Sequence, residues 1–79
     1  MQPSDSDRLQ AIFRAVFGYP DTRDVTSLRQ ISEKKWDSLG HTTLVAAIES
    51  EFDVAIDGAE ALQMTSFEAT RLLLEEKIS

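Results

Sequence analysis

Apolar residues recur every three or four positions through most of this chain, which is the spacing of one face of an amphipathic helix. The first apolar stripe consists of Leu9, Ile12, Phe13, Val16 and Phe17. It predicts a helix over residues 5–17 that Ser4 and Asp7 cap at the start and that Gly18 ends. No run of residues alternates β-branched with polar side chains over a useful length, so no strand is predicted.

Three further helices are predicted to begin at Asp37-Ser38, at Asp57-Gly58 and at residue 66. Their inner-face residues are Leu44, Val45, Ile48 and Phe52 in the first, and Phe67, Thr70, Leu74 and Ile78 in the last, with Leu73 at the edge. Asp53 ends the first of these helices, and the short one follows Asp57. The last covers residues 66–77 behind a capping box of Thr65 and Glu68. Arg71 falls near the middle of its inner face and is expected to extend outward along its stem.

A long connection, residues 18–37, separates the first two helices. A structureless loop of this length is unusual in a compact domain and is often functional. Val25, Leu28 and Ile31 are expected to hold it against the core. Since each helix is too short to be stable alone, the prediction is an all-α four-helix bundle with three longer helices, a short third helix and a long first loop. Residues 1–79 are expected to form one domain, with residues 1–4 disordered.

The composition of the 79 residues excludes several kinds of site. There is no cysteine, so disulfides and thiolate ligands are ruled out, and with His41 as the only histidine we expect no metal site. Fourteen acidic residues and eight basic ones give a formal net charge of −6, which argues against nucleic-acid binding and favours basic partner surfaces. No stretch is long enough to insert into a membrane, and residues 1–7 lack the pattern of a signal peptide. We expect a cytoplasmic monomer.

The candidate chemistry lies where the long loop meets the second helix. Asp37 and Ser38 are both common N-cap residues, so by themselves they indicate only a helix start. A serine at that place is exposed, and the backbone N–H groups of the first turn favour an attached phosphate. Ser38 has no evident activating base, and no acid–base pair, metal cluster or phosphate-cradling glycine loop can be assembled from the sequence. We therefore expect no catalytic residues, and a protein that other enzymes modify rather than an enzyme.

The motif Asp37-Ser38-Leu39 closes the long loop and is followed by Glu-Ser-Glu-Phe-Asp-Val at residues 49–54, then by a short acidic-capped helix and a final capped helix. In this combination, over about residues 5–78, the chain resembles the acyl carrier protein family. The resemblance implies that Ser38 carries a 4′-phosphopantetheine arm, attached covalently from coenzyme A by a phosphopantetheinyl transferase whose magnesium Asp37 helps to place. The thiol of the arm would carry acyl groups as thioesters.

The same resemblance implies that the second helix docks the acyl-loading and acyl-processing enzymes. Leu39 and Ala46 match apolar contact positions of the family, and Glu49 matches an acidic one. Glu60, in the short third helix, is a further candidate contact for basic partners. These four residues are the predicted partner-binding positions, together with Asp37.

The chain departs from many fatty-acid carriers in the first turn after the serine, where Gly40 and His41 replace acidic residues, and Lys34-Lys35 precede the motif. These departures favour a dedicated pathway, such as secondary metabolism or polysaccharide modification, over primary fatty-acid biosynthesis. Gly40 lowers the local helix propensity. Trp36 is expected to pack part of its ring on the loop, and His41 is expected to be a surface residue.

Two other functions stay open. Aminoacyl or peptidyl carriers usually have a Gly-Gly-x-Ser approach to the serine, which Lys35-Trp36-Asp37-Ser38 lacks. An unmodified helical docking domain would use Ser38 only as a helix cap, so that Ser38→Ala would cause a small loss of stability and leave partner binding normal. In a carrier, the same substitution would remove function and leave the fold intact.

Overall fold

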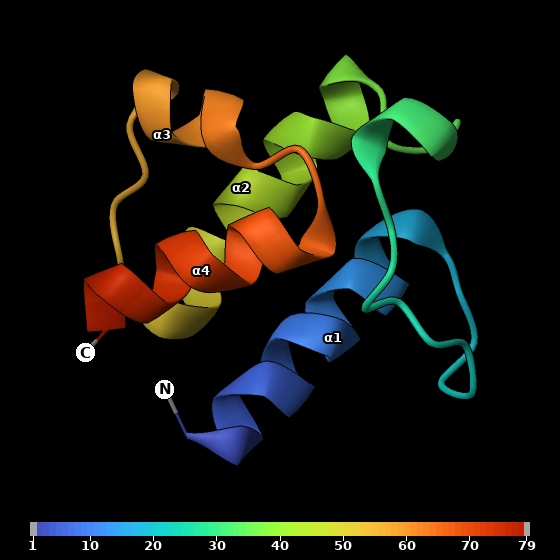
Figure 1. Cartoon of the computed structure of the whole chain (residues 1–79), viewed down its shortest axis with the longest axis horizontal. Helices are drawn as coiled ribbons and strands as arrows, with labels where there is room; N and C mark the ends of the chain where they lie inside the picture. Colours follow the sequence, from blue (N-terminus) through green and yellow to red (C-terminus); the bar gives the residue numbers. More distant parts are fainter. Residues whose placement is uncertain (1, 79) are drawn as a thin grey trace.

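The structure is a computed structural model that describes residues 2–78 (Figure 1). Its helices are α1 (Pro3–Phe17), α2 (Ser38–Phe52), α3 (Gly58–Gln63) and α4 (Phe67–Ile78), and a 3₁₀ turn, η1 (Gln30–Ser32), lies in the long loop between α1 and α2. The only strand-like pairing within residues 2–78 is an isolated bridge between Arg29 and Ser66, so the predicted all-α architecture is confirmed. None of the helices in this range combines the length and apolar character needed to cross a bilayer.

The first helix begins earlier than predicted. Pro3 is well suited to a first helical position because its φ angle is preset and it lacks an N–H that would have no partner there. The Gln2 N–H donates to Asp5 Oδ2 at 3.0 Å, so Gln2 and Asp5 form the cap that was predicted at Ser4. Disorder was predicted for residues 1–4, but Pro3 and Ser4 are part of α1. Met1 lies outside the described residues.

The start of α4 also differs by one residue. Ser66 Oγ accepts the Ala69 N–H at 2.9 Å and so takes the capping role. The predicted box of Thr65 with Glu68 does not form, because the Thr65 N–H donates to the Gln63 carbonyl at 2.9 Å and the Glu68 carboxylate pairs with Arg71. The isolated bridge to Arg29 holds Ser66 in an extended conformation at this point, so Ser66 becomes the capping residue.

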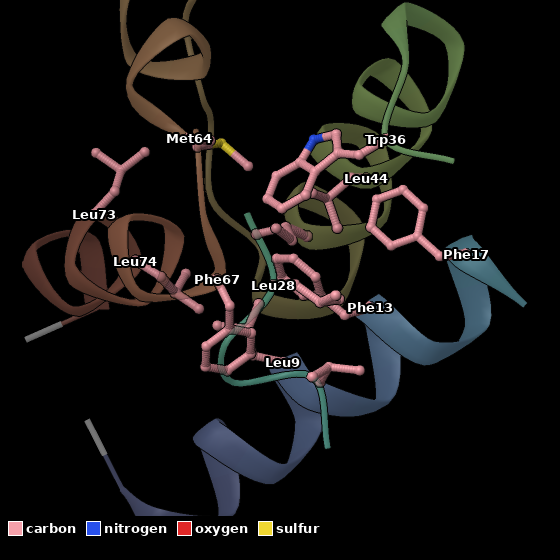
Figure 2. Close-up of a cluster of buried hydrophobic side chains, with 12 residues drawn as sticks. Leu9, Phe13, Phe17, Leu28, Trp36, Leu44, Met64, Phe67, Leu73 and Leu74 are labelled. Atoms are coloured by element: carbon pink, nitrogen blue, oxygen red, sulfur yellow. The ribbon is translucent and has the colours of Figure 1, made fainter. Parts of the chain in front are cut away.

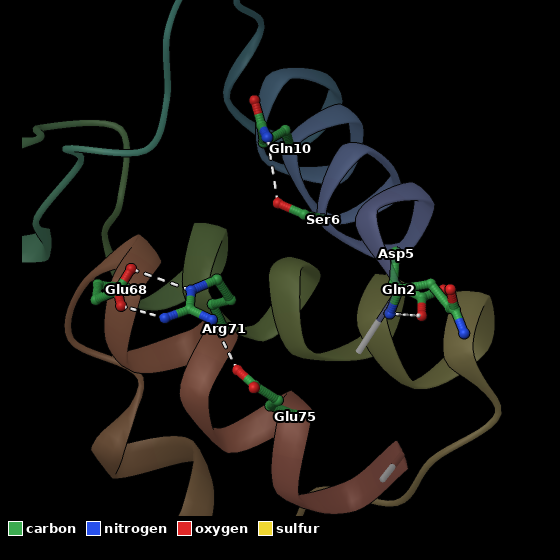
Figure 3. Close-up of polar contacts among 7 residues, drawn as sticks. All are labelled: Gln2, Asp5, Ser6, Gln10, Glu68, Arg71 and Glu75. Atoms are coloured by element: carbon green, nitrogen blue, oxygen red, sulfur yellow. Dashed lines mark hydrogen bonds and ion pairs between the residues drawn. The ribbon is translucent and has the colours of Figure 1, made fainter.

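Arg71 extends outward from α4, as predicted, and lies between two carboxylates one turn away on either side (Figure 3). Hydrogen bonding to Glu68, with a smaller contribution from Glu75, raises the pKa of the Arg71 guanidinium. The buried face of the helix consists of Phe67, Thr70, Leu73 and Leu74. Leu73 is thus part of that face and not its edge, and it is Ile78 that is only half-buried.

The core lies between α1, α2 and α4 and also receives side chains from the long loop (Figure 2). Its buried members are Leu9, Phe13, Phe17, Val25, Leu28, Trp36, Leu44, Ile48, Met64, Phe67, Leu73 and Leu74. The ring of Phe13 packs edge-on against those of Phe67 and Trp36, with centroids 5.0 and 5.4 Å away. Trp36 was expected to pack only part of its ring on the loop, but it is only 2 % exposed, so its whole ring is buried. It anchors the end of the loop in the core.

The long loop follows the core over part of its length. Val25 and Leu28 are buried, as predicted, whereas Ile31 is 87 % exposed and does not hold the loop against the core. The reason lies in the backbone, because the Leu28 carbonyl accepts the Phe67 N–H at 2.9 Å and the chain then turns away through η1. The turn carries Ile31 outward.

Both boundaries of α2 and the start of α3 agree with the predicted ones. Asp53 ends α2 in the left-handed conformation, with a φ angle of 54°. Asp57 caps α3, since its Oδ1 accepts the Glu60 N–H at 2.8 Å while Glu60 Oε1 accepts the Asp57 N–H at 3.1 Å. This short helix lies at the edge of the bundle, away from α1 (Figure 1).

Candidate functional site

Ser38 is the first residue of α2 and is exposed. The preceding Asp37 caps the helix, because its backbone is extended and its Oδ1 accepts the Gly40 N–H at 2.8 Å. The predicted alternative role of Ser38 as the cap is therefore wrong. With Asp37 in that role, the Ser38 hydroxyl has no hydrogen-bond partner within residues 2–78.

The first turn of α2 also keeps backbone donors free beside this hydroxyl. The Gly40 N–H is taken by the Asp37 carboxylate, and the His41 N–H donates to the Asp37 carbonyl at 2.8 Å. In the described chain the N–H groups of Ser38 and Leu39 have no partner. Free N–H groups at the positive end of a helix dipole favour an anion attached at that place.

Gly40 brings the loop into contact with this turn. A Cβ atom at position 40 would lie 2.5 Å from the Lys35 carbonyl oxygen and 3.2 Å from Cε1 of Phe17. The low helix propensity noted from the sequence thus has a tertiary reason, since only glycine permits this approach. Together with the burial of Trp36, the contact fixes the backbone on the loop side of Ser38.

His41 is half-buried, so it lies only partly on the surface where it was predicted. Its Nδ1 lies 2.9 Å from Nε1 of Trp36 and its Nε2 lies 2.8 Å from the Ala61 carbonyl oxygen. The two rings stack at an interplanar angle of 22°. Because both ring nitrogens have partners, neither is available to take a proton from Ser38 in this arrangement. No cluster of metal-binding side chains occurs in residues 2–78 either.

The predicted partner-binding residues lie on α2 and α3, but they do not meet in one place. Leu39, which is 77 % exposed, and Ala46, which is also exposed, lie two turns apart on one face of α2. Ala46 and Glu49 line a hollow of about 320 Å³ between α2 and α3, whereas Leu39 lines a second one, of about 370 Å³, beside α1. A further hollow of about 560 Å³, at Arg29–Ile31 and Thr65–Ser66, includes none of the predicted site residues.

Two of the predicted acidic contacts, Glu49 and Glu60, already have partners within the chain. Glu49 Oε2 accepts the Ile56 N–H at 2.8 Å and so holds the loop that follows α2. Glu60 pairs with Lys77 of α4 at 2.8 Å, and hydrogen bonds from Lys77 and from the Asp57 N–H lower the pKa of the Glu60 carboxyl. A cationic partner at either position would compete with these bonds.

No protein-family model matches this chain, and no match is found among curated proteins. The site is therefore defined by its own geometry, which is a free serine hydroxyl at the start of α2 on a backbone fixed on its loop side. The sequence indicated Ser38 and Asp37 as candidates, but the contact at Gly40 and the bridge through His41 were not predicted. The one signal in the sequence that could have indicated the His41 bridge is Trp36, because a buried tryptophan needs an acceptor for its indole N–H.

Proposed function

We propose that this protein is a carrier whose Ser38 accepts a 4′-phosphopantetheine arm and presents acyl intermediates as thioesters. The observation that carries the proposal is the state of Ser38, an exposed residue whose hydroxyl is free because Asp37 caps the helix. The arm would come from coenzyme A in a transferase reaction in which Ser38 Oγ displaces 3′,5′-ADP from phosphorus and loses its proton. The phosphodiester would then lie beside the free N–H groups of Ser38 and Leu39.

Three further features support this function. The fold has the predicted three longer helices, short third helix and long first loop, and an acyl-carrier type of bundle is part of the proposal. The chain has no cysteine, so a thioester requires a thiol from an attached group. The exposed Leu39 and Ala46 and the net charge of −6 suit docking to loading and processing enzymes with basic surfaces.

Asp37 would have two functions in this proposal. Its carboxylate caps α2 and, in the transferase complex, would help to place a magnesium ion. Asp37→Asn keeps an oxygen that can cap the helix but removes the charge. We expect this variant to retain the wild-type stability within a few tenths of a kcal/mol and to be modified more slowly. Equal rates of modification would argue against the second role.

The decisive test is intact-protein mass spectrometry after incubation with coenzyme A, magnesium and a broad-specificity phosphopantetheinyl transferase. The wild type should gain one phosphopantetheine group, and Ser38→Ala should gain none. Ser50→Ala is a matched control, because Ser50 is an exposed serine of the same helix and its loss should leave the modification intact. If folded wild-type protein gains nothing with several transferases, the carrier proposal fails and an unmodified docking domain is the better account.

The nature of the cargo separates two forms of the proposal. We favour acyl groups from a dedicated biosynthetic pathway, because Gly40 and His41 replace acidic residues and Lys34-Lys35 precede the motif. An aminoacyl or peptidyl carrier is the alternative. Incubating the modified protein with acyl-activating and with aminoacyl-activating enzymes, and weighing the products, distinguishes the two.

A further inference from the structure

The short helix α3 is held by few contacts. None of its residues is buried, and Glu60 forms an ion pair with Lys77 of α4 at 2.8 Å. In the described part of the chain, the one hydrogen bond between α2 and α3 joins His41 Nε2 to the Ala61 carbonyl oxygen, at 2.8 Å. That carbonyl lies in the last turn of α3 and also accepts the Met64 N–H at 3.1 Å, so His41 occupies its second acceptor position. Elements with few buried contacts open most readily, so this bond is well placed to control α3.

The partners of His41 define which tautomer of its ring can form both contacts. An indole nitrogen is only a donor, so Trp36 Nε1–H requires an unprotonated Nδ1 on His41. A carbonyl oxygen only accepts, so Ala61 requires a proton on Nε2. Both contacts are satisfied by the same species, the neutral ring with its proton on Nε2. The buried Trp36, 2 % exposed, thus fixes the tautomer that binds α3.

We propose that His41 is a positioning residue that latches α3 onto α2, with Trp36 holding its ring in the tautomer that the latch requires. His41 and Ala61 both line the hollow of about 320 Å³ between the two helices, together with Val45, Ala46 and Ile56. The latch therefore sets the width of this hollow. Its functional role rests on the proposed function, since it would determine how much room a group on the Ser38 arm finds between α2 and α3.

The first measurement is the tautomer of the His41 ring in the unmodified wild-type protein, from long-range proton–nitrogen NMR correlations near neutral pH. The chain has one histidine and one tryptophan, so both ring signals are assigned directly. We expect a protonated Nε2, a bare Nδ1 and a slowly exchanging indole N–H on Trp36. A ring protonated on Nδ1, or on both nitrogens, would overturn the proposal.

The second measurement is amide hydrogen exchange of α3 and α1 in three variants. His41→Ala removes both bonds, Trp36→Phe removes the indole donor and keeps an aromatic ring, and Thr43→Ala is the control. Thr43 is exposed in the same part of α2, and its hydroxyl donates only to the Leu39 carbonyl of its own helix. Because a typical hydrogen bond contributes modestly to stability, His41→Ala should speed exchange in α3 by roughly 2- to 10-fold, with a smaller factor in α1.

The outcomes decide between a latch and a general structural role. Trp36→Phe should speed exchange in α3 less than His41→Ala does, and Thr43→Ala should leave it at the wild-type rate. The proposal is refuted if His41→Ala accelerates exchange equally in α1 and α3, or leaves α3 unchanged. If His41→Ala does not fold, the proposal is tested by the ring tautomer of the wild type and by the exchange rates of Trp36→Phe. All measurements use the unmodified chain, so they hold whether or not Ser38 accepts an arm.

Discussion

Replacing Gly40 by alanine should destabilise the protein, although alanine is the better helix former. The substitution adds a Cβ atom 2.5 Å from the Lys35 carbonyl oxygen, where ordinary contacts begin at 3.4 Å. The atom that must yield belongs to the backbone, and the ring of Phe17 lies 3.2 Å away on another side. The loop therefore has to retreat from the first turn of α2 by about 1 Å.

Two effects of opposite sign decide the magnitude. Overpacking of this kind costs about 1–3 kcal/mol, whereas replacing glycine by alanine inside a helix gains about 1 kcal/mol in propensity. The expected result is a net loss of about 1 kcal/mol in the free energy of unfolding. Gly58 offers a matched control, because nothing lies within 4 Å of its added Cβ and its φ angle is not positive. Gly58→Ala should be stabilising by about 0.4–1 kcal/mol.

Urea unfolding followed by tryptophan fluorescence measures both variants, since Trp36 is the only tryptophan and is buried. The two variants should lie on opposite sides of the wild type. If Gly40→Ala proves as stable as the wild type or more stable, the loop does not press on the first turn of α2, and the account of how the backbone beside Ser38 is fixed is refuted.

Three other predictions follow from the core and the ion pairs. Phe13→Ala removes a fully buried ring and should cost about 3–5 kcal/mol, so circular dichroism should show a largely unfolded chain in this small domain. The folded-state pKa values of Glu60 and Glu68 are lowered, by Lys77 and Arg71 respectively, so their contribution to stability is present above the unfolded value of 4.5 and is lost as the pH falls below it. Urea midpoints should therefore decline below a pH of about 5; an unchanged midpoint would contradict the assigned ion pairs. Lys77→Met should flatten this decline without abolishing it, because Glu68 keeps its partner.

The helices could be predicted because their signals are local. Apolar spacing located the three longer helices, Asp57-Gly58 indicated the short one, and Asp37, Asp53 and Asp57 mark boundaries that the structure reproduces. The cap of α4 could not be predicted, since Thr65 and Ser66 are equally suitable by type and the tertiary pairing of residues 28–30 with residues 65–67 places Ser66 at the helix start. Ile31 was misplaced for a similar reason.

The features of the candidate site also fall into those that the sequence predicts and those that it does not. The sequence itself determines that a serine begins a helix after a long loop, in an acidic chain without thiols. Helix caps depend on a few neighbouring residues, and charge and composition are properties of the whole chain, so none of them depends on tertiary contacts. Only the tertiary structure decided three other features. Ser38 is left free while Asp37 caps the helix, Gly40 permits the close approach of the loop, and His41 joins Trp36 to Ala61. The last of these contacts joins residues twenty positions apart, and a hydrogen bond between distant residues depends on packing that brings their atoms within about 3 Å, which no local pattern encodes.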